Sequence, residues 1–169
     1  AGNKILVGII RDITERVRAE DALRRAHEEL EQRVRERTAE LVRANAELRE
    51  SEERFRATFE QAAVGVAHLS LDGRFLRVNQ RLSEILGGTQ SELLERSFRD
   101  FTYVEDLEAS ASALHDLARG RTSSVSFDER CVRVDGSRVW VHLTTTRVHD
   151  ARGEPAYLIA VIEDISARK

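Results

Sequence analysis

The sequence predicts an α+β domain, in which a five-stranded antiparallel sheet carries helices on one face, preceded by a long coiled-coil helix. One segment is rich in Glu, Arg, Ala and Leu and contains no Gly or Pro, which is typical of a continuous helix. The remainder alternates between short β-rich runs, turn signals and short helical patterns. Because a sheet of only five strands must bury one face, we expect the helices between its second and third strands to cover that face.

Charge separates these two parts and excludes several classes of protein. The 169 residues include 27 Lys+Arg and 30 Asp+Glu, and the charged fraction of 34% exceeds the roughly 25% of an average domain. A net charge of -3 gives no basis for binding nucleic acid. One Cys excludes a disulfide framework and a cysteine-rich zinc site. No apolar run reaches the roughly 18 to 20 residues that span a bilayer, so we expect a cytoplasmic protein without direct membrane insertion.

Charged residues are most concentrated between Glu15 and Arg56, where apolar residues recur at a seven-residue spacing. Such a repeat wraps two helices into a left-handed coiled coil. His27 and Arg37 also lie on the seam, so we predict a weak, adjustable parallel homodimer through this helix. The alternative is a solvated single helix held by Glu/Arg pairs three and four residues apart. The predicted seam consists of Leu23, Leu30, Val34, Leu41, Leu48 and Phe55.

Turn residues place the elements of the second part. Asp72-Gly73 and Asp135-Gly136 predict hairpin turns. The expected strands span residues 64–71, 75–78, 123–134, 138–148 and 157–165. Three helices are expected between the second and third strands: one capped by Asn79 and ended by Gly87-Gly88, one opened by Ser91, and one over 106–119.

One internal repeat indicates a tandem organisation. Ile5 to Arg16 reads ILVGIIRDITER, and Leu158 to Lys169 reads LIAVIEDISARK. In the first copy the long helix follows at once. We therefore expect the second copy to end a complete domain and the first copy to be the tail of a preceding domain.

Residues 51–169 resemble a PAS domain. The resemblance rests on SEERFRATFEQAAVGVAHLSLDGRFLRVN at the entrance, YVEDLEAS before the last helix, RCVRVDGSRVWVHLTTTRVHDARGEP across the central hairpin and EDISARK at the exit. The preceding QRVRERTAELVRANAEL resembles the signalling-helix linkers of bacterial multi-PAS sensor histidine kinases. The expected parts are residues 1–14 as the tail of a preceding PAS-like domain, 15–56 as signalling helix and coiled coil, and 57–169 as the PAS domain.

The resemblance implies a PAS-like five-stranded antiparallel sheet and a sensory or relay module in a signal-transduction receptor. Sheet changes caused by a ligand or a neighbouring module would pass through the helices to an output domain, expected to be a histidine kinase and less often a diguanylate cyclase. The partners would then be adjacent PAS and output domains of the same chain. The exit motif joins the last strand to the outgoing helix, where an Asp can cap the helix. The motif residues are Asp164, Ile165 and Ser166, with Asp12, Ile13 and Thr14 for the preceding domain.

Candidate pocket and cofactor residues lie on the predicted sheet and its last helix. Val139, Val141 and Leu143 share one face of a strand, and Trp140 shares the other face with His142. There the end of the long helix near Phe55 or a dimer partner would cover Trp140. The alternative places Trp140 inside the core. The expected pocket residues are Val139, Val141, Leu143, Leu114 and His115.

The haem-binding PAS branch takes an axial His from the helix that holds His115, so His115 is a haem candidate, although its sequence context differs from that branch. The flavin-adduct branch has its Cys in a helical Asn-Cys-Arg-Phe-Leu-Gln run, whereas Cys131 lies on a strand, so flavin is not expected. We expect no cofactor and no metal site.

No catalytic motif is present. The sequence lacks a Gly-rich phosphate loop and a nucleophile motif with a base, and Glu105-Asp106 is explained by dipole complementarity at a helix start. We therefore expect a non-catalytic segment. The alternatives to a sensory relay are a ligand-free PAS module for dimerisation, and a haem-binding gas or redox sensor that uses His115.

Overall fold

The computed structural model describes residues 11–169. The chain divides into two units, one that ends at Glu52 and one that runs from Glu53 to Lys169. Residues 5–10, the β-rich run of the first repeat copy, lie outside the described residues.

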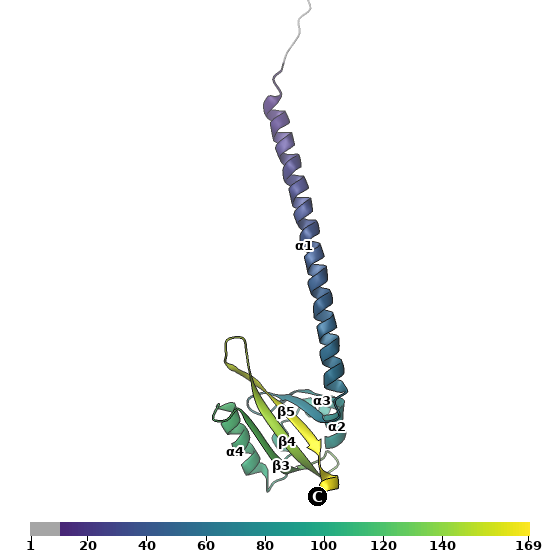
Figure 1. The fold of residues 1–169 in the computed structure, drawn as a ribbon, viewed down its shortest axis with the longest axis vertical. Coiled ribbons are helices and arrows are strands. Elements are labelled where there is room, and N and C mark those ends of the chain that lie inside the picture. Colours follow the sequence, from purple (N-terminus) through teal and green to yellow (C-terminus); the bar gives the residue numbers. More distant parts are fainter. Residues whose placement is uncertain (1–10) are drawn as a thin grey trace, which may run out of the picture. The chain divides into compact units, whose positions relative to one another are not determined.

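The long helix α1 covers Thr14–Glu60 and so continues beyond the predicted end at Arg56 (Figure 1). Ion pairs three or four residues apart lie along it, such as Arg16 with Glu20 at 2.7 Å and Arg33 with Glu29 at 2.9 Å. The predicted seam residues are all exposed in this single chain. Among the described helices, none is both long enough and apolar enough to cross a membrane.

The second unit contains one five-stranded antiparallel sheet, which confirms the predicted fold class (Figure 1). Its strands lie in the order β2-β1-β5-β4-β3, so the first strand lies beside the last. Two hairpins, β1–β2 and β3–β4, flank the central strand β5. The strands are β1 (Gly65–Leu69), β2 (Phe75–Val78), β3 (Ser124–Val132), β4 (Arg138–His149) and β5 (Pro155–Asp164).

Short helices connect β2 to β3, as predicted: α2 (Gln80–Leu86), α3 (Gln90–Leu94), the 3-10 turn η1 (Phe98–Asp100) and α4 (Leu107–Ala118). Asn79 caps α2 and the left-handed Gly87 ends it, in agreement with the prediction. The predicted start of the next helix at Ser91 is wrong, because Thr89 is the cap. Thr89 accepts a hydrogen bond from the Glu92 amide while the Glu92 carboxylate accepts one from the Thr89 amide.

The core lies between the inner face of the sheet and these helices. Val139, Val141 and Leu143 are each at most 1% exposed, and Trp140 and His142 point to the other face, which confirms the predicted alternation. Gly65 allows α2 to approach β1, since a Cβ there would lie 3.0 Å from Leu82 Cδ1. The inner face of the sheet and the helices therefore pack closely against each other.

Candidate signal-relay site

The exit motif after β5 is capped by its own first residue. Asp164 Oδ1 accepts a hydrogen bond from the Ser166 amide at 2.9 Å, and the short turn η2 (Ser166–Arg168) follows. Partial burial opposes ionisation of Asp164, but the hydrogen bonds from Ser166 and the nearby Arg133 guanidinium hold the pKa of this carboxyl below its usual value. The buried Ile165 side chain, 5% exposed, anchors the motif to the unit.

The exit motif is also bonded to the neighbouring strand β4. The Ile165 amide donates to the Trp140 carbonyl at 2.9 Å, and the Trp140 amide donates to Ser166 Oγ at 3.2 Å. These two bonds continue the β4–β5 ladder past the end of β5. A shift of β4 along β5 would therefore displace the first residues of the exit segment.

Arg133 connects this motif to the helices on the other side of the sheet. Its Nη2 atom lies 3.6 Å from Asp164 Oδ2, and its Nε donates to the Ile85 carbonyl near the end of α2 at 2.8 Å. One side chain thus contacts both the helical layer and the exit motif. Since both contacts are partly buried, they are less screened by solvent than a surface ion pair.

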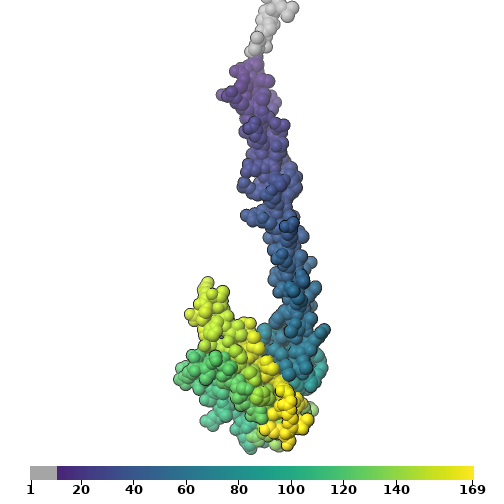
Figure 2. All heavy atoms as spheres, in the orientation of Figure 1, coloured from purple at the N-terminus to yellow at the C-terminus, as the bar shows by residue number. Residues whose placement is uncertain are grey.

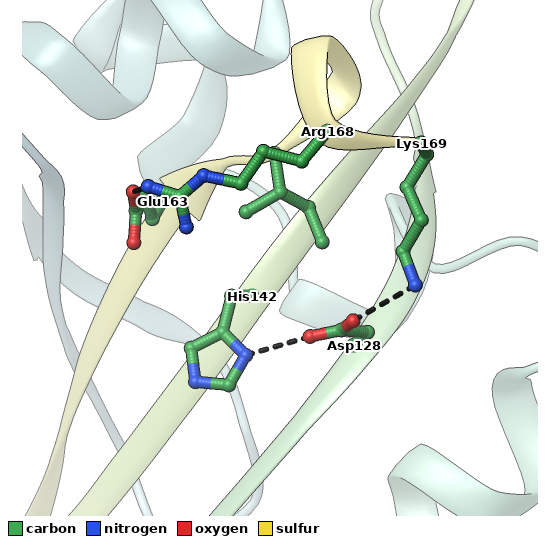
Figure 3. A pocket seen from close by; sticks show the side chains of 6 residues that line it. Asp128, His142, Glu163, Arg168 and Lys169 are labelled. Atoms are coloured by element: carbon green, nitrogen blue, oxygen red, sulfur yellow. Dashed lines mark hydrogen bonds and ion pairs between the residues drawn. The ribbon is translucent and has the colours of Figure 1, made fainter.

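A shallow cavity of about 390 Å³ lies beside the exit segment on the outer face of the sheet (Figure 3). Within it, Asp128 bonds to His142 Nδ1 at 2.7 Å and to Lys169 Nζ at 3.0 Å, while Arg168 pairs with Glu163 at 2.9 Å. The hydrogen bond from His142 and the Lys169 ammonium lower the pKa of Asp128. These pairs hold the C-terminal residues, which are yellow in Figure 2, against the sheet.

Ser126 extends this group along β3. Its Oγ lies 3.0 Å from His142 Nε2, so that Ser126, His142 and Asp128 have the connectivity of a hydrolase triad. Ser126 Oγ also lies 2.9 Å from Thr144 Oγ1, and Ser126 is not among the residues that line the adjacent cavity. A hydrolase triad also requires hydrogen-bond donors that face the oxyanion formed next to its nucleophile. We therefore interpret Ser126, His142 and Asp128, which lie on the open face of the sheet, as a polar ladder between paired strands.

The entrance to the second unit is built around one buried amide. Asn79 Nδ2 donates to the carbonyls of Phe59 at 2.9 Å and Val64 at 3.0 Å, and its Oδ1 accepts from the Val66 and Leu82 amides. Asn79 is fully buried, and these four hydrogen bonds satisfy its side chain. It links the last turn of α1 to β1 and α2.

The comparisons with known proteins agree on the family. The PAS family profile, described as the PAS fold, matches residues 53–165. The chain belongs to the PAS family. Its domain resembles the crystal structure of the PAS domain of an HTR-like protein from Haloarcula marismortui, at 30% identity and a TM-score of 0.61 over 73% of this chain and 98% of that one. A PAS domain from Colwellia psychrerythraea, 14% identical, has a TM-score of 0.63 over 69% of this chain and 98% of that one.

Two curated relatives are signalling proteins. The protein named Probable diguanylate cyclase DgcE, from Escherichia coli (strain K12), is 35% identical over 120 residues, which cover 71% of this chain and 11% of that protein. Sensor histidine kinase TmoS, from Ectopseudomonas mendocina, is 24% identical over 129 residues, which cover 76% and 13%. This chain therefore spans about a tenth of the length of the relatives that it matches, and within them the PAS domain is a sensory and signalling module.

The Asp cap found at the exit of the PAS domain also occurs at the start of α1. The Thr14 amide donates to Asp12 Oδ1 at 2.9 Å, and the hydrogen bonds from Thr14 lower the pKa of Asp12. Ile13 is 55% exposed, whereas its counterpart Ile165 is buried. The first copy thus shows the cap alone, and its role in relay stays a prediction.

The predicted pocket residues separate in the PAS domain. Leu114 and the three β4 residues belong to the buried core, whereas His115 is exposed. His115 lines an outer cavity of about 240 Å³ together with Leu114, Asp72 and Arg99. This volume lies below the roughly 300 to 1,000 Å³ of sites for drug-sized molecules, so the cavity offers little room for a haem. Cys131 is fully buried, and burial strongly raises the pKa of its thiol, which agrees with an inert core residue.

One feature of the PAS domain contradicts a sequence-based expectation, and a second adds a contact that was not expected. Phe55 packs on Phe59 and His68 rather than covering Trp140, which is flanked by Arg130 and Lys169. Asp106 lies at the start of α4, as expected, although its side chain makes no cap there. Its carboxylate instead accepts hydrogen bonds from the Arg130 amide at 2.9 Å and from the Arg130 guanidinium at 2.6 and 2.9 Å.

Sequence reasoning missed Arg133 as a connector and Glu129 as a buried acid. Arg133 adjoins a hairpin turn, where a basic residue carries no local signal of a long-range partner. Glu129 could have been found, because the inward-facing positions of β3 are otherwise Val125, Phe127 and Cys131. A carboxyl group within such an apolar alternation indicates a buried charge.

Proposed function

We propose that this chain is a cytoplasmic sensory and relay segment of a bacterial signal-transduction receptor, itself without catalytic activity. A ligand or a neighbouring module would alter the sheet, and the change would pass through the exit motif to an output domain of the same chain. The proposed output is a histidine kinase, and adjacent PAS domains are the expected neighbours. We propose neither a nucleic-acid partner nor direct insertion into a membrane.

The contact between Arg133, Ile85 and Asp164 carries the proposal. It lies where the helical layer, the β3–β4 turn and the exit segment meet. A displacement of α2 would change the Arg133 position and hence the neutralisation of Asp164. Since Asp164 caps the exit segment, its position bears directly on the direction of the outgoing chain.

The test is Arg133→Ala in the full-length receptor, with Arg152→Ala in the exposed β4–β5 turn as the matched control. We expect the Arg133 variant to uncouple stimulus from output and the Arg152 variant to respond normally. Autophosphorylation and cyclic dinucleotide synthesis are both measured, with and without stimulus. Arg133→Lys keeps the charge but loses the Nε donor to Ile85, and we expect partial recovery. A normal stimulus response in Arg133→Ala would refute this relay.

A diguanylate cyclase is the second candidate output. The relative with 35% identity carries that name, whereas the histidine kinase relative is 24% identical. The same two assays on the full-length receptor separate the candidates, because phosphorylation of a His and synthesis of a cyclic dinucleotide give different products.

We further propose that α1 forms a parallel homodimer through its predicted seam. In support, Leu23 and Leu41 are 72% and 71% exposed in the single chain, although Leu is a residue that a stable helix normally buries. The double variant Leu30→Glu/Leu41→Glu should sediment as a monomer at concentrations where the original chain is a dimer. Val42→Glu, which adds one such charge off the seam, should remain dimeric. Equal behaviour of both variants would contradict the seam.

A further inference from the structure

A cavity of about 260 Å³ lies between the start of α4 and the edge strand β3. All charged side chains that line it are acidic: Glu105, Asp106, Asp128 and Glu129. Ser110 and Phe127 complete much of its wall. The volume lies just below the roughly 300 Å³ lower limit for drug-sized ligands, which favours a small metabolite.

Two of the four carboxylates share one basic partner. Arg130 Nη2 lies 2.6 Å from Asp106 and 3.0 Å from Glu105. Hydrogen bonds from Arg130 lower the pKa of Asp106, so Asp106 stays ionised at neutral pH. Asp106 and Glu105 therefore share the single positive charge of Arg130.

A third carboxylate, Asp128, is compensated from the outer face of the sheet. His142 and Lys169 both bond to it there. Its charge is therefore directed away from the inner layer that contains Glu129.

Glu129 has no such partner. It is 2% exposed, and in the part of the chain that the structure describes neither carboxylate oxygen has a hydrogen-bond partner of normal geometry. Burial raises the pKa of Glu129 to about 7, the Asp106 charge adds to the rise, and the Ser110 hydroxyl opposes it. The β4 residue opposite is the uncharged Val141. An ionised Glu129 thus lacks a counter-ion, which is costly for a buried charge.

We propose that this cavity binds a small organic ammonium ion, with Glu129 as its counter-ion and Phe127 as an aromatic contact. Carboxylate and aromatic groups together favour an ammonium group with an organic body. Within residues 11–169, no group of three His, Cys, Asp or Glu side chains could hold a metal ion. The inference rests on the proposed sensory function, for which it names the class of ligand.

Calorimetric titration of the 169-residue protein with putrescine, choline and the neutral 1,4-butanediol tests the proposal. We expect at least one ammonium to bind and the diol to give no heat of binding. Because the cation binds ionised Glu129, its affinity should fall about tenfold for each pH unit below about 7. Diol binding equal to that of putrescine, no ammonium binding, or an affinity independent of pH would each overturn the proposal.

The variant Glu129→Gln should weaken ammonium binding at least tenfold and abolish its pH dependence, while Glu154→Gln in the exposed β4–β5 turn should bind normally. If Glu129→Gln does not fold, proton release by the original protein decides, since binding at pH 6.5 must release protons into the buffer. Zero proton release overturns the role of Glu129. A failed titration together with an uncoupled Arg133→Ala receptor rejects this ligand class and leaves the relay intact.

Discussion

The two units of the chain use their apolar residues in opposite ways. In the PAS domain, Leu143 and Leu158 are completely buried, whereas Leu23 and Leu41 of α1 are more than two-thirds exposed. The backbone groups of α1 bond within the helix, and many of its charged side chains form Glu/Arg pairs. Its apolar row, in contrast, is exposed in the single chain. If the proposed homodimer forms, the PAS domain is expected to unfold independently of protein concentration and α1 to depend on association.

Leucine truncation in each unit breaks this comparison most directly. Leu143→Ala should destabilise the PAS domain by about 2 to 5 kcal/mol, since it removes a fully buried side chain. Leu41→Ala should leave the unfolding of the PAS domain unchanged and alter only the helical signal, in a way that depends on protein concentration. Chemical denaturation followed by Trp140 fluorescence and by helical circular dichroism separates the two. Equal effects on the Trp140 transition would show that the units are not independent.

The next largest effect concerns the buried acid of the PAS domain. With a pKa of about 7 when folded and about 4.5 when unfolded, Glu129 binds more protons in the folded state across that interval. The free energy of unfolding should therefore fall by about 3 kcal/mol as pH rises from about 4.5 to 7, and then level off. Glu129→Gln should remove this component and be the more stable protein at pH 8.

Denaturation midpoints between pH 5 and 8 check this prediction. Glu154→Gln serves as the control because its side chain is exposed. If the difference between Glu129→Gln and the original chain does not change with pH, Glu129 is ionised in the folded state throughout.

A smaller effect is expected at the start of α4. Asp106→Asn would leave the partly buried Arg130 without its closest charged partner, so we expect a loss of about 1 to 3 kcal/mol. The contribution of this pair depends on ionised Asp106, whose pKa is lowered, and so the original chain should lose it only under strongly acidic conditions. Thermal unfolding of both proteins at pH 7 and at pH 3 measures it. A variant as stable as the original at pH 7 would contradict the assignment.

The smallest effect is expected on the solvated face of α1. Arg33→Ala removes a pair with Glu29 in which both side chains are about 70% exposed, so we expect a change below about 0.5 kcal/mol. Helical circular dichroism at low and high salt should be nearly superimposable for both proteins. A large change would show that α1 depends on its charge pairs as a single helix rather than on its apolar seam.

Local signals in the sequence predicted much of the PAS fold. Asp-Gly turns, the Asn79 cap, the Gly87 stop and the alternation of Val139, Val141 and Leu143 each act within a few residues, and each appears in the structure. The N-terminus of α3 was missed by two positions because Ser91 and Thr89 are both good caps, and only Thr89 has Glu92 three residues later.

The candidate site was less predictable, because its contacts join distant parts of the chain. The exit motif was found from the repeat, but Arg133 bonds Ile85 across 48 residues, and Asp106 pairs with Arg130 across 24. Such pairs depend on which strands become neighbours, and β3 becomes an edge strand only once the whole sheet order is set. Asn79 makes both a local and a long-range contact, since it caps α2 and also bonds Phe59, twenty residues away.

The register between β1 and β5 also has a mechanical consequence. Gly65, the first residue of β1, pairs with Ile162 near the end of β5, so the two points at which the chain enters and leaves the sheet are adjacent. In an antiparallel pair pulled from one end, the bonds break one after another instead of sharing the load. Tension between the incoming and outgoing chain would therefore unzip β1 from β5, starting beside the exit motif, at a lower force than shear would require.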